Sequence, residues 1–203
     1  MEKELTKADW LRAARLALLR GGPEAVRVER LARTLRVTKG SFYWHFSTRG
    51  QLLEFLLQEW EQELPELLVR MKGRSRSEAL HFLVSYMVKA TELSERGEAP
   101  SDAAVFAWAS VSPAVAARVN AIEKKRLAAL NRITGRRDRV EPVYLMWLGF
   151  VARGQRLPGS RKRFPQIARM MLNFLTFPVP PRSAQGKTGA TLRPPSRNLR
   201  RTR

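Results

Sequence analysis

The 203-residue sequence predicts an all-α protein, and three observations predict it. Apolar residues recur at the i, i+3, i+4 spacing of a helix in one segment after another. Ser or Thr precedes several of these segments, at the position where a side-chain oxygen caps the first turn of a helix. No segment alternates apolar and polar residues as a half-buried strand does. We therefore expect about nine helices, arranged as an N-terminal three-helix unit followed by a larger C-terminal helical unit.

The first predicted helix begins at a capping box, in which Thr6 is the N-cap and Asp9 reaches back to it. It ends at Gly21-Gly22-Pro23. A second short helix is predicted over residues 27–35, with an apolar face formed by Leu31, Ala32 and Leu35. The apolar stripe of the first helix is Trp10, Ala13, Ala14, Ala17 and Leu18.

Residues 37–46 contain a turn, a short helix and an aromatic cluster within ten positions. Two short helices joined by a tight turn form a helix-turn-helix, whose second helix enters the DNA major groove. Phe42 and Phe46 fall on the face toward Leu31 and Leu35, so we expect both rings in the core.

A long helix is predicted from the capping residue Thr48, and Pro65 should kink or end it. Ser75, Ser101 and Ser112 are predicted N-caps of three further helices, the last of which ends near Gly135. Residues 143–151 are apolar on every face, and such a helix must be buried on both sides. A final helix is predicted over residues 164–177, and these last two helices are expected to form a homodimer interface.

The net charge of +20 is unevenly distributed along the chain. Residues 1–53 hold eleven Lys and Arg against five Asp and Glu, while thirteen Lys and Arg and no acidic residue follow Glu141. This pattern suits a polyanionic partner, although solvated basic faces explain part of the charge. Residues 178–203 have five prolines, seven Lys and Arg and no aromatic residue, so we expect a disordered basic tail.

The N-terminal fifty residues resemble the DNA-binding domain of the TetR family of transcriptional regulators. The matching residues are Val28-x-x-Leu31-Ala32, the run from Val37 to Phe46, and Arg49-x-x-Leu52-Leu53. The resemblance implies a homodimeric repressor that a small-molecule effector releases from double-stranded operator DNA. It also implies a DNA-binding domain over residues 1–50 and an effector-binding and dimerisation domain over residues 51–177.

Two positions depart from the family pattern. Arg27 occupies the cap position where the family has Thr or Ser, and this side chain is expected at a phosphate instead. Arg36 occupies the turn position where the family has Gly. A left-handed backbone at a residue with a Cβ costs about 1–2 kcal/mol.

The family motif, applied residue by residue, implies the DNA contacts. Thr38 is expected to cap the recognition helix and hold a phosphate, while Lys39, Gly40 and Ser41 face the groove. Tyr43, His45 and Arg49 are expected to contact the DNA backbone. Trp44 is expected either to contact a thymine methyl or to pack against the first helix of the protein. A structural hydrogen bond is the alternative for His45.

Large apolar residues of the central helices are candidates for lining an effector cavity, with ordinary core packing as the alternative for each. Such a ligand would shift the protein toward a state whose two recognition helices no longer match successive major grooves. The predicted cavity residues are Tyr86, Phe106, Trp108, Tyr144 and Trp147, with Met87, Met146 and Phe150 beside them.

Other classes of function are disfavoured by the residues themselves. The sequence has no HExxH, GxSxG or Walker motif and only two histidines, so we expect neither an enzyme nor a bound cofactor or metal. It lacks cysteine, an apolar signal segment and a membrane-length apolar run, which favours a cytoplasmic location. The alternative to a regulator is an architectural protein that binds DNA through charge, without regard to sequence.

Overall fold

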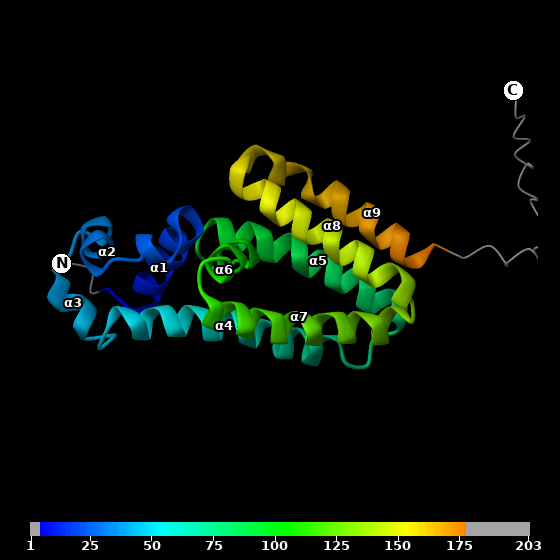
Figure 1. Cartoon of the computed structure of the whole chain (residues 1–203), viewed down its shortest axis with the longest axis horizontal. Helices are drawn as coiled ribbons and strands as arrows, with labels where there is room; N and C mark the ends of the chain where they lie inside the picture. Colours follow the sequence, from blue (N-terminus) through cyan, green and yellow to red (C-terminus); the bar gives the residue numbers. More distant parts are fainter. Residues whose placement is uncertain (1–4, 178–203) are drawn as a thin grey trace, which may run out of the picture.

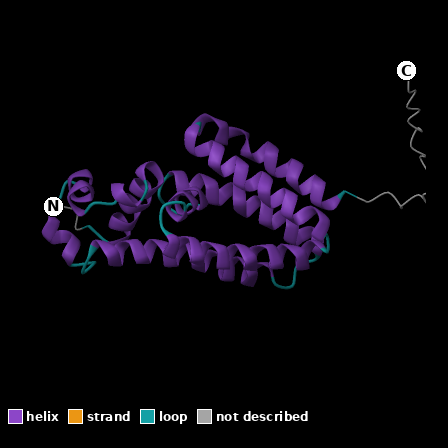
Figure 2. Cartoon of the chain, viewed as in Figure 1, coloured by secondary structure: helices purple, strands orange, loops and turns teal. Residues whose placement is uncertain are grey.

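The structure, a computed structural model, describes residues 5–177. These residues form nine α-helices and two 3₁₀ turns and contain no strand, which confirms the predicted all-α fold (Figure 2). No helix in this described part is long and apolar enough to cross a bilayer. The predicted disordered tail, residues 178–203, lies outside the described residues.

Three helices form a small unit at one end of an elongated molecule (Figure 1). They are α1 (Lys7–Gly21), α2 (Val28–Leu35) and α3 (Lys39–Tyr43), with a 3₁₀ turn over Pro23–Ala25 between the first two. The predicted capping box at the start of α1 is present: Thr6 N donates to Asp9 Oδ2 at 2.9 Å, and Asp9 N donates to Thr6 Oγ1 at 3.3 Å.

Helix α4 (Arg49–Met71) leaves this unit and runs along the length of the molecule (Figure 1). It begins at the predicted residue, where the Thr48 hydroxyl accepts a hydrogen bond from Gln51 N at 3.0 Å. Of the two expected effects of Pro65, a kink or an end of the helix, the end is wrong, because α4 continues for six residues beyond Pro65. Pro65 is exposed, whereas Leu64 before it and Met71 after it are buried, so packing holds both turns in place despite the missing backbone hydrogen bond.

Of the remaining helices, α6 and α7 pack against α4, while α8 and α9 pack against α7 and α5 on the opposite side of the molecule (Figure 1). Ser75, Ser101 and Ser112 each accept a hydrogen bond from the first turn of their helix, as predicted. Gly135 ends α7 in the left-handed conformation, with φ 61°. The elements are α5 (Arg76–Glu95), α6 (Asp102–Ala109), α7 (Pro113–Thr134), α8 (Arg137–Arg156), a 3₁₀ segment (Pro158–Arg163) and α9 (Phe164–Thr176).

Two clusters of buried side chains form the interior. The first extends from Trp10 in α1 through Trp60 in α4 to Val119 in α7, and thus joins the three-helix unit to the central helices. The second lies between α5, α8 and α9 and is centred on Trp147, Phe150 and Phe164. The Phe150 and Phe164 rings stack with their centroids 4.6 Å apart.

Helix α8 is covered on one side only within a single chain. Trp147 and Phe150 are buried, but Leu145 and Met146 are 59% and 45% exposed. The expectation that the 143–151 segment is buried on both sides is therefore not met by one copy of the chain. Gly149 lies on the same open side, where an added Cβ meets nothing within 4 Å.

The turn between α2 and α3 places Arg36 in the left-handed region, with φ 59° and ψ 43°. It is the only residue other than glycine with a positive φ among residues 5–177. The turn needs this conformation to reverse the chain within the helix-turn-helix, so the Cβ of Arg36 is a source of strain.

We expect Arg36→Gly to raise the free energy of unfolding by about 1 kcal/mol, because glycine adopts this conformation without a Cβ clash. The measurement is urea denaturation followed by circular dichroism. Arg33→Gly is the matched control: the same change inside α2 should lower stability by about 1 kcal/mol. A loss of stability in both variants would contradict the strain at Arg36.

Candidate nucleic-acid interface and ligand cavity

A buried aromatic cluster sets the orientation of the five-residue helix α3. The Phe42 and Phe46 rings are 0% and 1% exposed and stack with centroids 5.4 Å apart. Trp10 of α1 meets Phe42 edge to face at 5.3 Å. Both phenylalanines are in the core, as predicted. Because their side of α3 faces inward, the intervening residues point outward.

The outward side of α3 carries most of the predicted DNA contacts. Lys39, Gly40 and Tyr43 are exposed, and Ser41 is half-buried. Trp44 is 88% exposed, which excludes the alternative that its indole packs against the first helix. An apolar ring held in water by a short helix is available to a partner.

Thr38 stands at the N-cap position of α3, but the expectation that its hydroxyl caps the helix is wrong. Its side chain receives no hydrogen bond from the helix. Ser41 N donates instead to the backbone carbonyl of Thr38 at 3.2 Å. The exposed hydroxyl therefore remains available to an outside acceptor or donor such as a phosphate.

Several basic side chains of α2, of the turn after it and of α3 are exposed. Lys39 Nζ is 3.2 Å from Glu29 Oε1, in an ion pair whose two side chains are more than half exposed. Solvent screens such an exposed pair, so Lys39 exchanges partners at little cost. Arg27, which does not cap α2 with its side chain, donates to the Glu24 carbonyl at 3.0 Å. The other exposed arginines of this region are Arg30, Arg33 and Arg36.

Two of the predicted contact residues are engaged within the chain. His45 Nε2 lies 3.0 Å from the Leu5 carbonyl, which is the structural hydrogen bond that the sequence left as an alternative. Arg49 Nε donates to the Val26 carbonyl at 2.7 Å, and its guanidinium also contacts Glu24. Arg49 thus ties the start of α4 to the loop before α2.

A cavity of about 170 Å³ lies between α4, α5, the start of α6, α7, α8 and α9. Of the five predicted cavity residues, Tyr86, Tyr144 and Trp147 line it, together with Met87 and Phe150. The others lie elsewhere: Phe106 meets the Trp60 ring edge to face at 6.1 Å, Trp108 is buried in the first core cluster, and Met146 is exposed.

Polar groups gather at one part of this otherwise apolar cavity. Asp102 Oδ1 accepts hydrogen bonds from Trp60 Nε1 at 2.6 Å and from Arg126 Nη1 at 2.7 Å. The Arg126 guanidinium also lies over the Trp60 ring, 4.8 Å from its centroid. Burial opposes the charge of Arg126, but Asp102 outweighs it and keeps the pKa of Arg126 above its ordinary value. Asp102 and Arg126 therefore form a largely buried ion pair whose two charges cancel.

Glu63 lines the same cavity without a partner of this kind. Its carboxyl forms no hydrogen bond or ion pair among the described residues. Tyr144, which also lines the cavity, donates its hydroxyl to Glu123 at 3.0 Å instead. Burial, and then the charge of Asp102, raise the pKa of Glu63 to about 8. Burial and the proximity of Glu63 also raise the pKa of Tyr86 to about 12.

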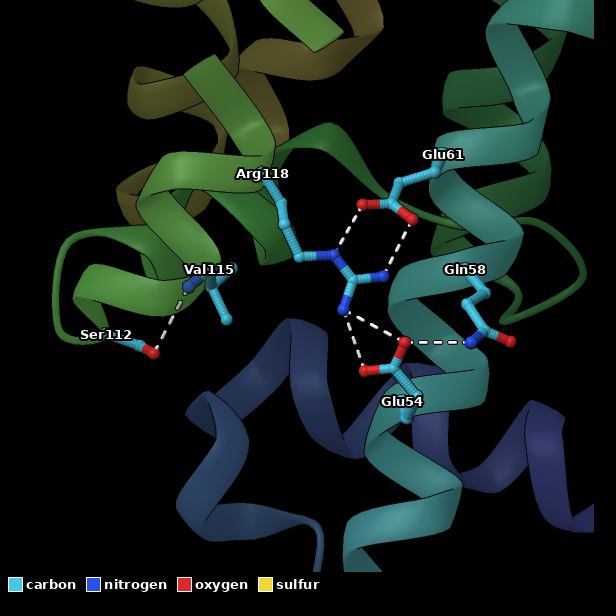
Figure 3. A network of polar contacts seen from close by, with 6 residues as sticks. All are labelled: Glu54, Gln58, Glu61, Ser112, Val115 and Arg118. Atoms are coloured by element: carbon cyan, nitrogen blue, oxygen red, sulfur yellow. Dashed lines mark hydrogen bonds and ion pairs between the residues drawn. The ribbon is translucent and has the colours of Figure 1, made fainter. Parts of the chain in front are cut away.

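A second polar network joins α4 to α7 (Figure 3). Arg118 donates to both oxygens of Glu61, at 2.6 and 2.7 Å, and to both oxygens of Glu54, at 2.9 and 2.8 Å. These bonds, with that to Glu61 the strongest, raise the pKa of Arg118 above its ordinary value. One guanidinium thereby bridges two turns of α4.

The sequence pattern did not reveal these buried charges. Asp102 follows the capping serine, and Glu63 and Arg126 interrupt apolar helix faces, but an interrupted face is only a weak signal of a functional site. No three His, Asp or Glu side chains within the described residues are grouped as a metal site would require.

Comparisons with known proteins agree with this geometry. Residues 11–56 match the model of a family described as bacterial regulatory proteins, tetR family. A crystal structure of a transcriptional regulator from Rhodococcus sp. Rha1 shares the fold, with a TM-score of 0.58 and 17% sequence identity over 84% of this chain and 96% of that one. A comparison with curated proteins returned no match. The resemblance to the TetR family predicted from the sequence is confirmed.

We expect Glu63→Gln to stabilise the fold in a pH-dependent manner. The raised pKa of Glu63 means that, between pH 4.5 and about 8, the folded state retains a proton that the unfolded chain has released. Wild-type stability therefore falls as the pH rises through this window. Glutamine does not titrate, so the variant should gain about 1–3 kcal/mol over wild type at pH 9, allowing for partial exposure, and little at pH 5.

Denaturant unfolding at the two pH values measures this difference. Glu66→Gln is the matched control, because Glu66 is an exposed residue of the same helix that does not line the cavity. An equal gain in both variants would show that burial in the cavity is not the cause.

Proposed function

We propose that this chain, a DNA-binding regulator of the TetR family by its residues 11–56, is a repressor that a small-molecule effector releases from its operator. The observation that carries the proposal is the exposed face of α3 at the tip of the molecule, held there by buried Phe42 and Phe46. Residues 1–50 are assigned to DNA binding and residues 51–177 to effector binding and dimerisation. No catalytic activity is proposed.

The proposed DNA contacts follow from exposure. Lys39 donates to guanine O6 or N7, while Gly40 and Ser41 allow the helix to approach the base edges. Tyr43, Thr38 and Arg27 contact the phosphate backbone, and Trp44 contacts a thymine methyl. His45 and Arg49 act indirectly, by holding the chain ends on either side of α3, because both already bond to backbone carbonyls.

Helix α4 provides the route between the cavity and the DNA. Its second half lines the cavity at Glu63 and Met71, and its first turn carries Arg49 against the helix-turn-helix. The Arg118 network holds this first half to α7. The effector binds the protein more tightly when α4 is in one position than when it is in another, and thereby favours that position. In a dimer this changes the distance between the two recognition helices. They then no longer match successive major grooves, which are about 34–36 Å apart.

The dimer forms through the open side of α8 and the neighbouring face of α9. The interface is apolar at Leu145 and Met146 of α8 and at Met170 and Phe174 of α9, each at least 45% exposed in one copy. Gly149 lets the partner helix approach closely. A symmetric pair of such faces buries the apolar area that a single chain leaves in water.

Selection of bound duplexes from a random DNA pool at about 150 mM salt tests sequence-specific binding. We expect a palindrome from the wild-type protein and its loss from a Lys39→Ala, Tyr43→Ala variant. Lys89→Ala is the matched control, since Lys89 forms an equally exposed ion pair with Glu92 on α5. Recovery of unenriched DNA would favour the charge-driven architectural protein, whose affinities are about 10⁻⁴–10⁻⁶ M.

Gly149→Glu should convert the dimer into a monomer without unfolding the chain. The new side chain enters open space in one copy, but it occupies the place of the partner helix. Sedimentation velocity at micromolar concentration measures the association state, and circular dichroism measures the helix content. Gly149→Ala should remain dimeric and gain up to about 1 kcal/mol of helix stability. A dimeric Glu variant would place the interface elsewhere.

A further inference from the structure

The cavity contains a carboxyl group that has no ion-pair partner, and the effector itself would supply that partner. Asp102 and Arg126 neutralise each other through a 2.7 Å hydrogen-bonded pair. Glu63 faces the same space with no hydrogen bond or ion pair among residues 5–177. Apart from the hydroxyl residues Thr91, Ser94 and Ser101, the rest of the lining is mainly aliphatic or aromatic. An unpaired carboxyl in such surroundings is costly when ionised.

We propose that the effector is an amphiphilic monocation, an amine with an apolar body of about one aromatic ring or a short alkyl chain, whose ammonium group pairs with Glu63. This inference rests on the proposed function, because it specifies the ligand of the same cavity. A cation brings the charges of Glu63, Asp102, Arg126 and the ligand to zero. An anion would face two carboxylates while the only arginine of the cavity is already paired.

The size of the cavity sets the size of the apolar body. A cavity of about 170 Å³ is comparable to an engineered apolar cavity of about 150 Å³ that binds benzene. Tyr86, Trp147 and Phe150 present ring surfaces to this space. A ring or six-carbon chain fills it, and the ammonium reaches the carboxyl at its polar part.

Binding of the cation should release a proton from Glu63. The groups that act on this carboxyl are Asp102 of α6, Arg126 of α7, Tyr86 of α5 and, on α4 itself, Glu59 and Glu66. Burial and Asp102 raise the pKa of Glu63 to about 8, so the free protein is mostly protonated there at pH 7. A bound ammonium lowers that pKa and displaces the proton to the buffer.

Isothermal titration of the full-length protein at pH 7 with hexylamine, 1-hexanol and hexanoate tests the proposal, since the three probes share one apolar body. Benzylamine and benzyl alcohol form a second matched pair. We expect each amine to bind at least tenfold more tightly than its alcohol, with hexanoate the weakest. Titration in two buffers of different ionisation enthalpy should show the release of nearly one proton per amine.

Glu63→Gln should abolish both the preference for the amines and the proton release, while its affinity for the alcohols stays within about twofold. Glu66→Gln, on the exposed side of the same helix, should keep the preference for the amines, because the charge of Glu66 affects the pKa of Glu63 less than burial and Asp102 do. Circular dichroism confirms that each variant is folded.

The outcomes separate this inference from the proposed function. Equal binding of amine and alcohol, tighter binding of hexanoate, or an unchanged preference in Glu63→Gln overturns the cationic ligand but leaves an effector cavity. If none of the five probes binds the wild-type protein, both the cationic ligand and the effector role of this cavity fail. Amine binding that leaves the affinity for the selected operator unchanged supports the ligand class but overturns the proposed release mechanism.

Discussion

Helix α4 belongs both to the core of the three-helix unit and to the wall of the cavity. The contacts that hold α4 therefore determine how these two parts of the molecule are placed relative to each other. Its first half buries Leu52 and Leu56 in the core of the helix-turn-helix. At its midpoint Trp60 is fully buried, donates to Asp102 and lies under the Arg126 guanidinium, which fixes α4 against α6 and α7. Its last turns line the cavity. Because a hydrogen-bonded helix is stiff, a displacement imposed at one end reaches the other.

The acidic residues along α4 show how one helix serves three purposes. Glu59, Glu61 and Glu63 are two positions apart, and such residues face in different directions on a helix. Accordingly Glu59 pairs with Arg15 of α1 at 2.7 Å, Glu61 with Arg118 of α7 at 2.6 Å, and Glu63 turns to the cavity. The two paired carboxylates hold helices together. The unpaired one is available to a ligand, at a cost to stability that rises with pH.

Helix α3 depends on tertiary contacts for its stability. A helix of five residues is too short to be stable alone. It is stable because Phe42 and Phe46 pack in the core with Trp10. The left-handed backbone at Arg36, although strained, also reverses the chain so that α3 can follow α2. The exposure of Tyr43 and Trp44 depends on the same anchoring. Rigid presentation of a short helix to DNA is thus a property of the aromatic cluster rather than of the helix itself.

The sequence by itself determined the helical class, the capping residues of α1, α4, α5, α6 and α7, and the buried aromatic face of α3. These features arise from neighbours in the chain, where periodicity and local hydrogen bonding act directly. Only the tertiary structure decided that α4 passes Pro65, that Phe106 and Trp108 lie outside the cavity, and that Thr38 leaves its helix uncapped by a side chain. It also decided which charges are paired: Arg118 meets Glu54 from 64 positions away, whereas Glu63 forms no ion pair within the described residues although the charge of Arg126 acts on it. Long-range partners depend on how whole helices pack, and no local pattern records that packing.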